Sequence, residues 1–225
     1  MNILVVVAHP DDEVLGLGGL IARYTEEGAN VYVHLLTHGR LPTVHPGTPP
    51  NCCLESAQIL GIRDVFVDHF ELFGLDNLPL VDIAQSIEKY AASIQPEIVL
   101  THHRGDINQD HQVAHQAVMV AMRPGGLLRT IRSVLTFEIA SSTEWGTIAQ
   151  QIPFVPNVFL DITKTLEKKL LALGCYQSEM REYPHPRSFE YVKHLAGVRG
   201  ATVGYMAAEA FTLVRDIDYF EHILK

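Results

Sequence analysis

Three acidic residues stand side by side directly after a hydrophobic run near the start of the chain. Residues 5–19 read VVVAHPDDEVLGLGG, and adjacent carboxylates repel one another unless a positive charge lies among them. His9 and Asp12 are three residues apart at an expected turn, a spacing that lets both side chains face one point while Asp11 points elsewhere. His111 would complete a set of two histidines and one carboxylate with open positions for water.

Such a set of side chains is typical of a catalytic metal site. Imidazole nitrogen and carboxylate oxygen bind zinc or ferrous iron, and a vacant position accepts the water used in hydrolysis. An ion held by His9, Asp12 and His111 would offset the crowding of the acidic residues. It would also leave Asp11 free to act as a base. The sequence therefore predicts one Zn²⁺ per chain, with Fe²⁺ as the alternative ion.

These residues also have simpler interpretations. Acidic residues in the first turn of a helix are favoured by the helix dipole, so DDE alone could mark a helix start. His9 and Pro10 argue for a site, because an ordinary helix cap does not need a histidine at the end of a strand. His111 and His115 are spaced as in half of an HExxH site, but Gln112 replaces the glutamate. We therefore expect His115 to be structural or to support a ligand.

Hydrophobic runs rich in β-branched residues alternate along the chain with amphipathic segments. The predicted strands cover residues 3–8, 30–37, 64–67 and 97–101, followed by looser runs at 133–145, 157–163 and 209–215. The predicted helices cover residues 14–27, 54–60, 81–94, 110–122, 166–175 and 189–197. Continuous hydrophobic strands separated by helices indicate a mostly parallel sheet covered on both faces. We therefore expect an α/β fold, a single Rossmann-like domain over residues 1–225.

Residues that could do chemistry follow the ends of three predicted strands. They are His9, Asp11 and Asp12, then His38 and Arg40, then His102, His103, Asp106, Asp110 and His111. Because ligands bind outside the carboxyl ends of parallel strands, these loops should converge on one edge of the sheet. The glycines within 16–19 do not predict a dinucleotide site, because that motif needs its glycines at the strand-to-helix turn, where this chain has HPDDE.

The composition of the chain excludes several classes of partner. Its 225 residues are 47% hydrophobic, enough for one large domain, and the formal net charge is -9 without a basic run. Nucleic acids and anionic membranes call for clustered lysine and arginine, so we expect a small-molecule partner and no nucleic acid. No apolar stretch approaches the roughly 20 residues of a membrane span. Three cysteines without a paired pattern favour a reducing compartment, so we predict a cytoplasmic protein.

Several motifs of the chain resemble those of a known family. AHPDDEVLGLGG with the later NQDHQVAHQA is similar to the LmbE/PIG-L family of zinc-dependent de-N-acetylases, and SSTEW, PHPRS and AEAF resemble its bacterial branch. By that resemblance His9 and Asp12 match the first two zinc ligands, His111 matches the third and Asp11 matches the general base. The resemblance implies an enzyme, a single deacetylase domain that removes an N-acetyl group from an amino sugar or its conjugate and releases acetate.

One departure from the family pattern concerns the second motif. Where many members carry His-Pro-Asp-His, this chain has Asn-Gln-Asp-His, so an asparagine, Asn108, replaces a histidine often assigned as electrostatic partner or acid. Asn108 could donate a neutral hydrogen bond to the oxyanion, or His103 or His185 could enter the site instead. We expect Asp110 to orient His111 or Asn108, a role that metal-bound histidines usually require.

The substrate and the partners are less closely defined by the sequence. The candidate sugar or leaving-group contacts are Arg40, His103, Glu138, Trp145, His185 and Arg187, each weighed against a salt bridge or a packing role. A metal-dependent amidase acting on a thiol conjugate or another acyl amide is an alternative, as is a non-catalytic sugar-binding module. The free base Asp11 argues against pure binding. Family members are often oligomeric, so a homo-oligomer in which a partner subunit supplies a residue such as His185 is a further expectation.

Overall fold

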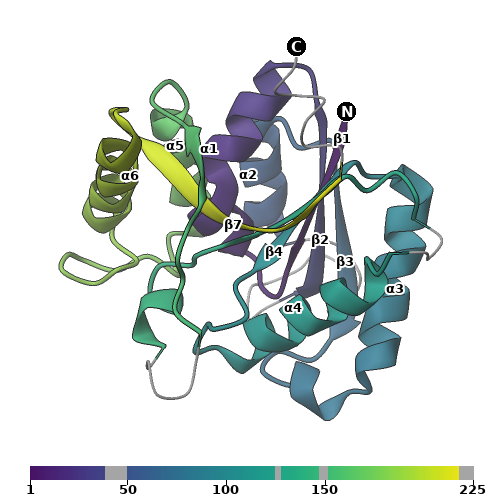
Figure 1. The fold of residues 1–225 in the computed structure, drawn as a ribbon. Helices are drawn as coiled ribbons and strands as arrows, with labels where there is room; N and C mark the ends of the chain where they lie inside the picture. The colour runs from purple at the N-terminus through teal and green to yellow at the C-terminus, as the bar shows by residue number, and fades with distance from the viewer. Residues whose placement is uncertain (39–49, 125–127, 147–151, 218–225) are drawn as a thin grey trace.

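The computed structural model describes residues 1–38, 50–124, 128–146 and 152–217. Within these residues, seven strands form one sheet in the order β3-β2-β1-β4-β5-β7-β6 (Figure 1). Their bounds are β1 Asn2–Val7, β2 Asn30–Thr37, β3 Asp64–Phe70, β4 Ile98–His102, β5 Ser133–Phe137, β6 Val158–Asp161 and β7 Ala208–Asp216. The first five strands are mutually parallel, and β7 runs antiparallel to its neighbours β5 and β6. The expected α/β fold with a mostly parallel sheet is confirmed.

Helices cover both faces of this sheet, as Figure 1 shows. Their bounds are α1 Asp12–Glu26, α2 Asn51–Leu60, α3 Leu80–Ile94, α4 Gln109–Ala121, α5 Leu166–Leu173 and α6 Phe189–Val203. Alternate residues of β1 enter two separate cores, because Val5 packs with α1 and α2 while Val6 packs with α3 and α4. A strand that is buried on both faces needs a continuous hydrophobic run, which explains the NILVVV sequence of β1.

The glycines of α1 bring this helix close to its neighbours. A Cβ atom added to Gly16 would lie 2.4 Å from the Phe137 ring, and one added to Gly19 would lie 2.7 Å from the Ile162 side chain. Larger residues at either position would push α1 away from the rest of the core. The GLGG segment is therefore a close-packing surface, which fits its position inside the helix rather than at the strand-to-helix turn.

A buried ion pair ties three elements together behind the site. Lys169 of α5 contacts Glu209 of β7 at 2.6 Å, and both side chains are 5% exposed. Lys169 also donates to the carbonyl of Leu15, while Glu209 accepts the N–H groups of Gly19 and Leu20. These bonds fix α1, whose first turn carries the acidic residues, against α5 and β7.

Two element boundaries differ most from the sequence-based expectation. The run at 133–145 contains a strand only to Phe137, because Ser141 adopts a left-handed backbone and Thr143 accepts the N–H of Ile139 in a turn. The helix α6 continues past Gly197 and ends at Val203, and the next residue, Gly204, has the left-handed φ of 82° that commonly follows a helix end. No helix among the described residues is long and apolar enough to cross a membrane.

Candidate active site

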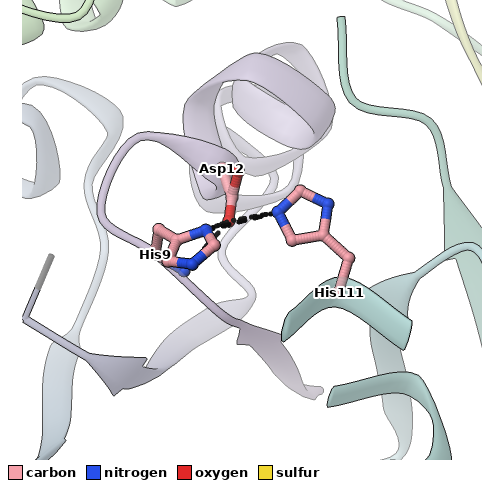
Figure 2. Close-up of side chains that lie close together, drawn as sticks. All are labelled: His9, Asp12 and His111. Carbon is pink, nitrogen blue, oxygen red and sulfur yellow. Dashed lines mark hydrogen bonds and ion pairs between the residues drawn. The ribbon is translucent and has the colours of Figure 1, made fainter. Parts of the chain in front are cut away.

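Three side chains from the turn after β1 and the start of α4 point toward one another (Figure 2). Asp12 Oδ2 lies 3.3 Å from His9 Nδ1 and 3.3 Å from His111 Nε2. The two histidine nitrogens are themselves 3.3 Å apart. The fold therefore brings together residues that are about one hundred positions apart in sequence, since β1 and β4 are adjacent parallel strands.

The three donor atoms have the composition and spacing that a divalent metal ion requires. Zinc ligands at about 2.0–2.1 Å in tetrahedral geometry lie about 3.3–3.4 Å from one another, and these separations agree with that value. The second carboxylate oxygen, Asp12 Oδ1, is buried and has no hydrogen-bond partner among the residues that the structure describes. Two imidazole nitrogens and one carboxylate oxygen suit zinc or ferrous iron. His9, Asp12 and His111 thus form a possible metal site.

Each histidine is oriented by a buried carboxylate on its other ring nitrogen. Asp110 Oδ2 contacts His9 Nε2 at 3.0 Å, and Asp106 Oδ2 contacts His111 Nδ1 at 3.1 Å. These contacts fix the ring positions and leave His9 Nδ1 and His111 Nε2 to face the cluster. We predicted that Asp110 orients His111 or Asn108: its carboxylate contacts His9 instead of His111 and also accepts the N–H groups of Phe73 and Leu75, whereas its backbone N–H donates to the side-chain oxygen of Asn108.

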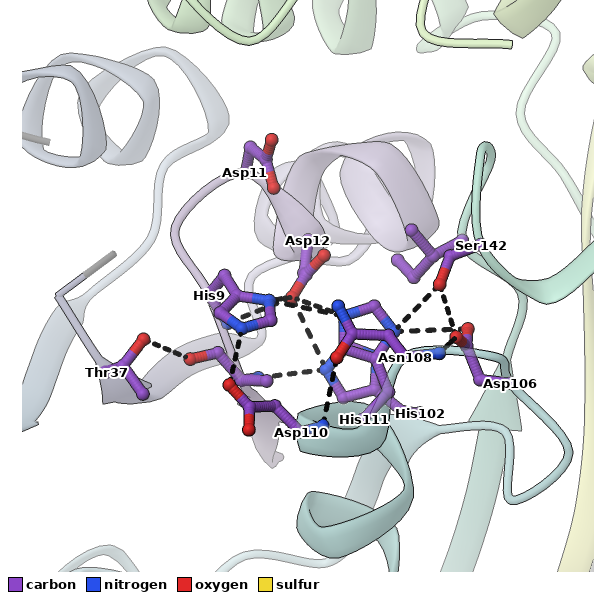
Figure 3. A network of polar contacts seen from close by, with 12 residues as sticks. His9, Asp11, Asp12, Thr37, His102, Asp106, Asn108, Asp110, His111 and Ser142 are labelled. Atoms are coloured by element: carbon purple, nitrogen blue, oxygen red, sulfur yellow. Dashed lines mark hydrogen bonds and ion pairs between the residues drawn. The ribbon is translucent and has the colours of Figure 1, made fainter. Parts of the chain in front are cut away.

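Asp106 joins two loops of the site and received no role in the sequence analysis. Its carboxylate accepts hydrogen bonds from the hydroxyl of Ser142 and the N–H of Asn108 (Figure 3). It also accepts one from the hydroxyl of Thr143. It is fully buried. Its position in the loop that follows β4 pointed to the site, but its partners in SSTEW lie 36 and 37 residues further along the chain.

His102, at the end of β4, forms the floor of the cluster. Its ring stacks on that of His111 with centroids 3.9 Å apart, and its Nε2 accepts the N–H of Ala8 at 2.9 Å. Burial and the neighbouring His111 hold the pKa of His102 well below its usual value. A neutral ring at this position connects the backbone before His9 to a metal-ligand candidate on α4.

Asp11 lies at the start of α1 with its side chain directed away from the cluster (Figure 3). Burial raises the pKa of Asp11 to about 7, although the positive charge of Arg187 opposes this rise. Arg187 Nη1 donates to Asp11 Oδ2, and Arg187 Nε donates to the hydroxyl of Ser141 at 2.8 Å. The expected sugar contact Arg187 therefore lies against the carboxylate that the sequence analysis assigned as the base.

Asn108 and His103 have partners within the protein. Asn108 is the N-cap of α4, and its side-chain oxygen accepts the N–H of Asp110 at 2.9 Å. His103 Nε2 contacts the carbonyl of Ile152 at 2.8 Å, and its ring meets Phe154 edge-on. His103 is thus part of the packing of the loop rather than a member of the cluster.

The remaining expected substrate contacts fall into two groups. Glu138 accepts two hydrogen bonds from Arg199, at 2.7 and 2.6 Å. Glu138 thus forms a salt bridge, the alternative to a substrate contact that we considered for it. Trp145 is 49% exposed and meets the ring of His185 edge-on, and His185 Nδ1 accepts the backbone N–H of Arg187. Arg40 lies outside the described residues.

The fold and the site together define a member of a known enzyme family. Residues 4–122, from β1 to the end of α4, match the family model PIG-L, described as GlcNAc-PI de-N-acetylase. This segment contains all three residues of the possible metal site. The chain belongs to the PIG-L family, as its motifs led us to expect.

Individual relatives match most of the chain in sequence, and a solved structure matches it in fold. A diacetylchitobiose deacetylase from Thermococcus kodakarensis is 28% identical over 240 residues, covering 99% of this chain and 85% of that protein. A 4-oxalmesaconate hydratase from Pseudomonas putida is 27% identical over 201 residues, covering 80% and 75%. The solved N,N'-diacetylchitobiose deacetylase from Pyrococcus horikoshii has a TM-score of 0.74 at 19% identity, covering 95% of this chain and 84% of that one.

Proposed function

We propose that this protein is a metal-dependent hydrolase that removes the N-acetyl group from an amino sugar or its conjugate and releases acetate. The observation that carries the proposal is the meeting of His9 Nδ1, Asp12 Oδ2 and His111 Nε2 at mutual separations of 3.3 Å. Membership of the PIG-L family and the likeness to a diacetylchitobiose deacetylase support it. A divalent ion at these donors, zinc or ferrous iron, would supply Lewis-acid activation of water and of the acyl carbonyl.

Asp11 is the residue that we assign to proton transfer. Its carboxylate is buried and is not one of the three converging donors, so it stays available as a base. It accepts a proton from the water that attacks the acyl carbon, and it then gives that proton to the amine that leaves when the C–N bond breaks. The hydrogen bond from Arg187 holds this carboxylate in one position during both proton transfers.

Asn108 is the residue that we assign to the oxyanion. Its side-chain oxygen is engaged by the N–H of Asp110, which leaves the amide nitrogen as the end that donates. A neutral donor aimed at a developing negative charge stabilises the tetrahedral state. The alternative donor His103 is bonded to the carbonyl of Ile152, which favours Asn108 for this role.

The sugar-binding surface that we propose lies at Trp145 and His185. Trp145 is half exposed, and its ring contacts that of His185 with centroids 6.0 Å apart. Aromatic side chains with a few polar groups are typical linings of small-molecule sites. Because His185 is bonded to the backbone of Arg187, a sugar held here would lie near Asp11.

A cytoplasmic location is also part of the proposal. Cys52, Cys53 and Cys175 are all free thiols. Thiols persist in reducing compartments, whereas secreted proteins tend to pair them. We therefore propose a small N-acylated sugar of the cytoplasm as the partner of the site.

The test is acetate release from a panel of substrates, with the metal content measured on the same sample. The panel contains N-acetylglucosamine, N,N'-diacetylchitobiose, N-acetylglucosaminyl malate, an N-formyl sugar, an O-acetyl sugar and an N-acetylated thiol conjugate. We expect chelator-sensitive acetate release from an N-acetyl amino sugar by protein that carries about one metal ion per chain. Cleavage of only the thiol conjugate or another acyl group would assign the alternative amidase function. Metal-loaded protein that binds sugars without cleaving any of them would be a binding module.

A further inference from the structure

Asp11 has a backbone conformation that is unusual for a residue with a side chain. Its φ is 100° and its ψ is -28°, in the left-handed region, although it is the N-cap of α1. N-cap residues usually have an extended backbone and bond their own side chain to the helix, but Asp11 makes no such side-chain bond. Residues other than glycine adopt this region rarely, and they persist there only when the surroundings enforce it.

The surroundings of Asp11 include an acceptor placed for its backbone. The N–H of Asp11 donates to Glu13 Oε2 at 3.0 Å, within the same turn. The other carboxylate oxygen, Glu13 Oε1, accepts a hydrogen bond from the hydroxyl of Tyr176. Tyr176 lies in the 3₁₀ turn η3, Gly174–Tyr176, which follows α5 directly. Glu13 and Tyr176 are 3% and 1% exposed, so solvent does not compete for these bonds.

We propose that Glu13 and Tyr176 form a backbone clamp that positions Asp11 for catalysis. Glu13 holds the Asp11 backbone in the left-handed conformation, and Tyr176 holds Glu13. The carboxylate of Asp11 is fixed separately by Arg187, so the residue is held at two points. Glu13 and Tyr176 are positioning residues that act through Asp11. The proposal rests on the proposed role of Asp11 as the base.

A purely structural role explains Glu13 less well. Among the described residues, no ion pair includes Glu13, so its carboxylate is buried without a cation. Burial raises the pKa of Glu13 to about 8, so burying this carboxyl group has a free-energy cost that an apolar side chain of the same size would not have. What an apolar side chain could not provide is an acceptor for the N–H of Asp11. The clamp therefore explains why a residue with a hydrogen-bond acceptor, and not an apolar residue, occupies position 13.

The test compares two neutral substitutions of similar size. Glu13→Gln keeps an oxygen that accepts the Asp11 N–H, whereas Glu13→Met fills the same volume without an acceptor. We expect Glu13→Gln to retain kcat close to the wild-type value. We expect Glu13→Met to lower kcat by about 10- to 100-fold, because small displacements of a catalytic group are costly. KM and the metal content should stay close to wild type in both variants.

A double-mutant cycle separates the clamp from a general loss of structure. In an Asp11→Asn background, Glu13→Met should cause no further loss of kcat, because the clamp acts through the Asp11 carboxylate. An equal fractional loss in both backgrounds would overturn the proposal. Equal retention of kcat by Glu13→Met and Glu13→Gln would also overturn it.

Amide hydrogen exchange at Asp11, followed by NMR, tests the clamp without any substrate. Wild type and Glu13→Gln should protect the Asp11 amide, and Glu13→Met should expose it. This result would hold even if the proposed deacetylase activity were wrong, so the two failures are distinguishable. If Glu13→Met does not fold, Tyr176→Phe replaces it, and a smaller increase in Asp11 amide exchange is expected. Unchanged exchange in the folded variant would contradict the clamp.

Discussion

Arg187 Nη1 donates to Asp11 Oδ2 across 176 residues of sequence, which connects the segment before α6 to the turn after β1. Arg187 is itself fixed by a bond from its Nε to Ser141. A guanidinium group held at two points fixes the position of the carboxylate that it contacts. The main role of Arg187 is therefore to orient the carboxylate of Asp11. Any contact of Arg187 with substrate is made from this position.

Replacing Arg187 tests this relationship. We expect Arg187→Met to lower kcat by at least about tenfold, because Asp11 then loses the group that orients its carboxylate. Arg187→Lys should recover little of this loss, since an ammonium group cannot keep the geometry of both bonds. Steady-state kinetics on the two variants measure the effect. A rise in KM with an unchanged kcat would mean that Arg187 binds substrate and does not orient Asp11.

Asp106 and Asp110 provide a matched pair for the metal site. Each contacts the outer nitrogen of one histidine, Asp106 that of His111 and Asp110 that of His9. We expect Asp106→Ala and Asp110→Ala each to weaken metal affinity by about 10- to 100-fold, measured by competition with a chromophoric chelator. Glu138→Gln is the control, because Glu138 bonds to Arg199 and not to a metal-ligand candidate. Wild-type affinity in both aspartate variants would contradict the proposed orienting role.

Asn108, His103 and His185 were the alternative donors to the oxyanion, and single substitutions separate the first two. We expect Asn108→Ala to lower kcat by about 10²-fold, as loss of one oxyanion donor does in other hydrolases. His103→Ala should leave kcat near wild type per folded molecule, because His103 bonds to Ile152 instead. Unfolding of each variant is followed to correct for stability. The reverse order of effects would assign the oxyanion to His103.

The buried pair Lys169 and Glu209 should matter for stability and not for chemistry. Lys169→Met leaves the Glu209 carboxylate buried without its cation, which costs about 3–5 kcal/mol of unfolding free energy. The double variant Lys169→Met with Glu209→Gln should recover part of that loss. Urea unfolding measures both. Lys193→Met is the control, because Lys193 pairs with the 82% exposed Glu167. A similar loss in the control would show that burial is not the cause.

The fold could be predicted because its strands are buried on both faces. Continuous apolar runs such as β1 and β2 are required in a parallel sheet with helices on both sides, and few other arrangements use them. The true end of α6, at Val203 before Gly204, could not be predicted, since a glycine at position 197 resembles the same stop signal. Gly200 shows why glycines occur inside this helix, because a Cβ there would lie 2.7 Å from the backbone of Ala207.

The site could be predicted only where its residues are neighbours in sequence or follow strand ends. His9 and Asp12 are neighbours in sequence after β1, and His111 lies beyond the end of β4, the strand next to β1. The partners of Asp106 and Asp110 were not predictable, because Asp106 lies in the loop before α4 and Asp110 contacts a histidine in the turn after β1, so neither contact follows a helical spacing. The contact of Arg187 with Asp11 depends on the path of the second half of the chain, which carries no local signal for it.

Acetate release from N,N'-diacetylchitobiose by wild type and by Asp11→Asn, with bound metal quantified in both, tests the proposed function and the role of Asp11 together. We expect about one metal ion per chain in both proteins and a loss of kcat of ~10²-fold or more in Asp11→Asn. Full activity in Asp11→Asn would contradict the role of Asp11. Failure of metal-loaded wild type to release acetate from any N-acetyl amino sugar would contradict the proposed function itself.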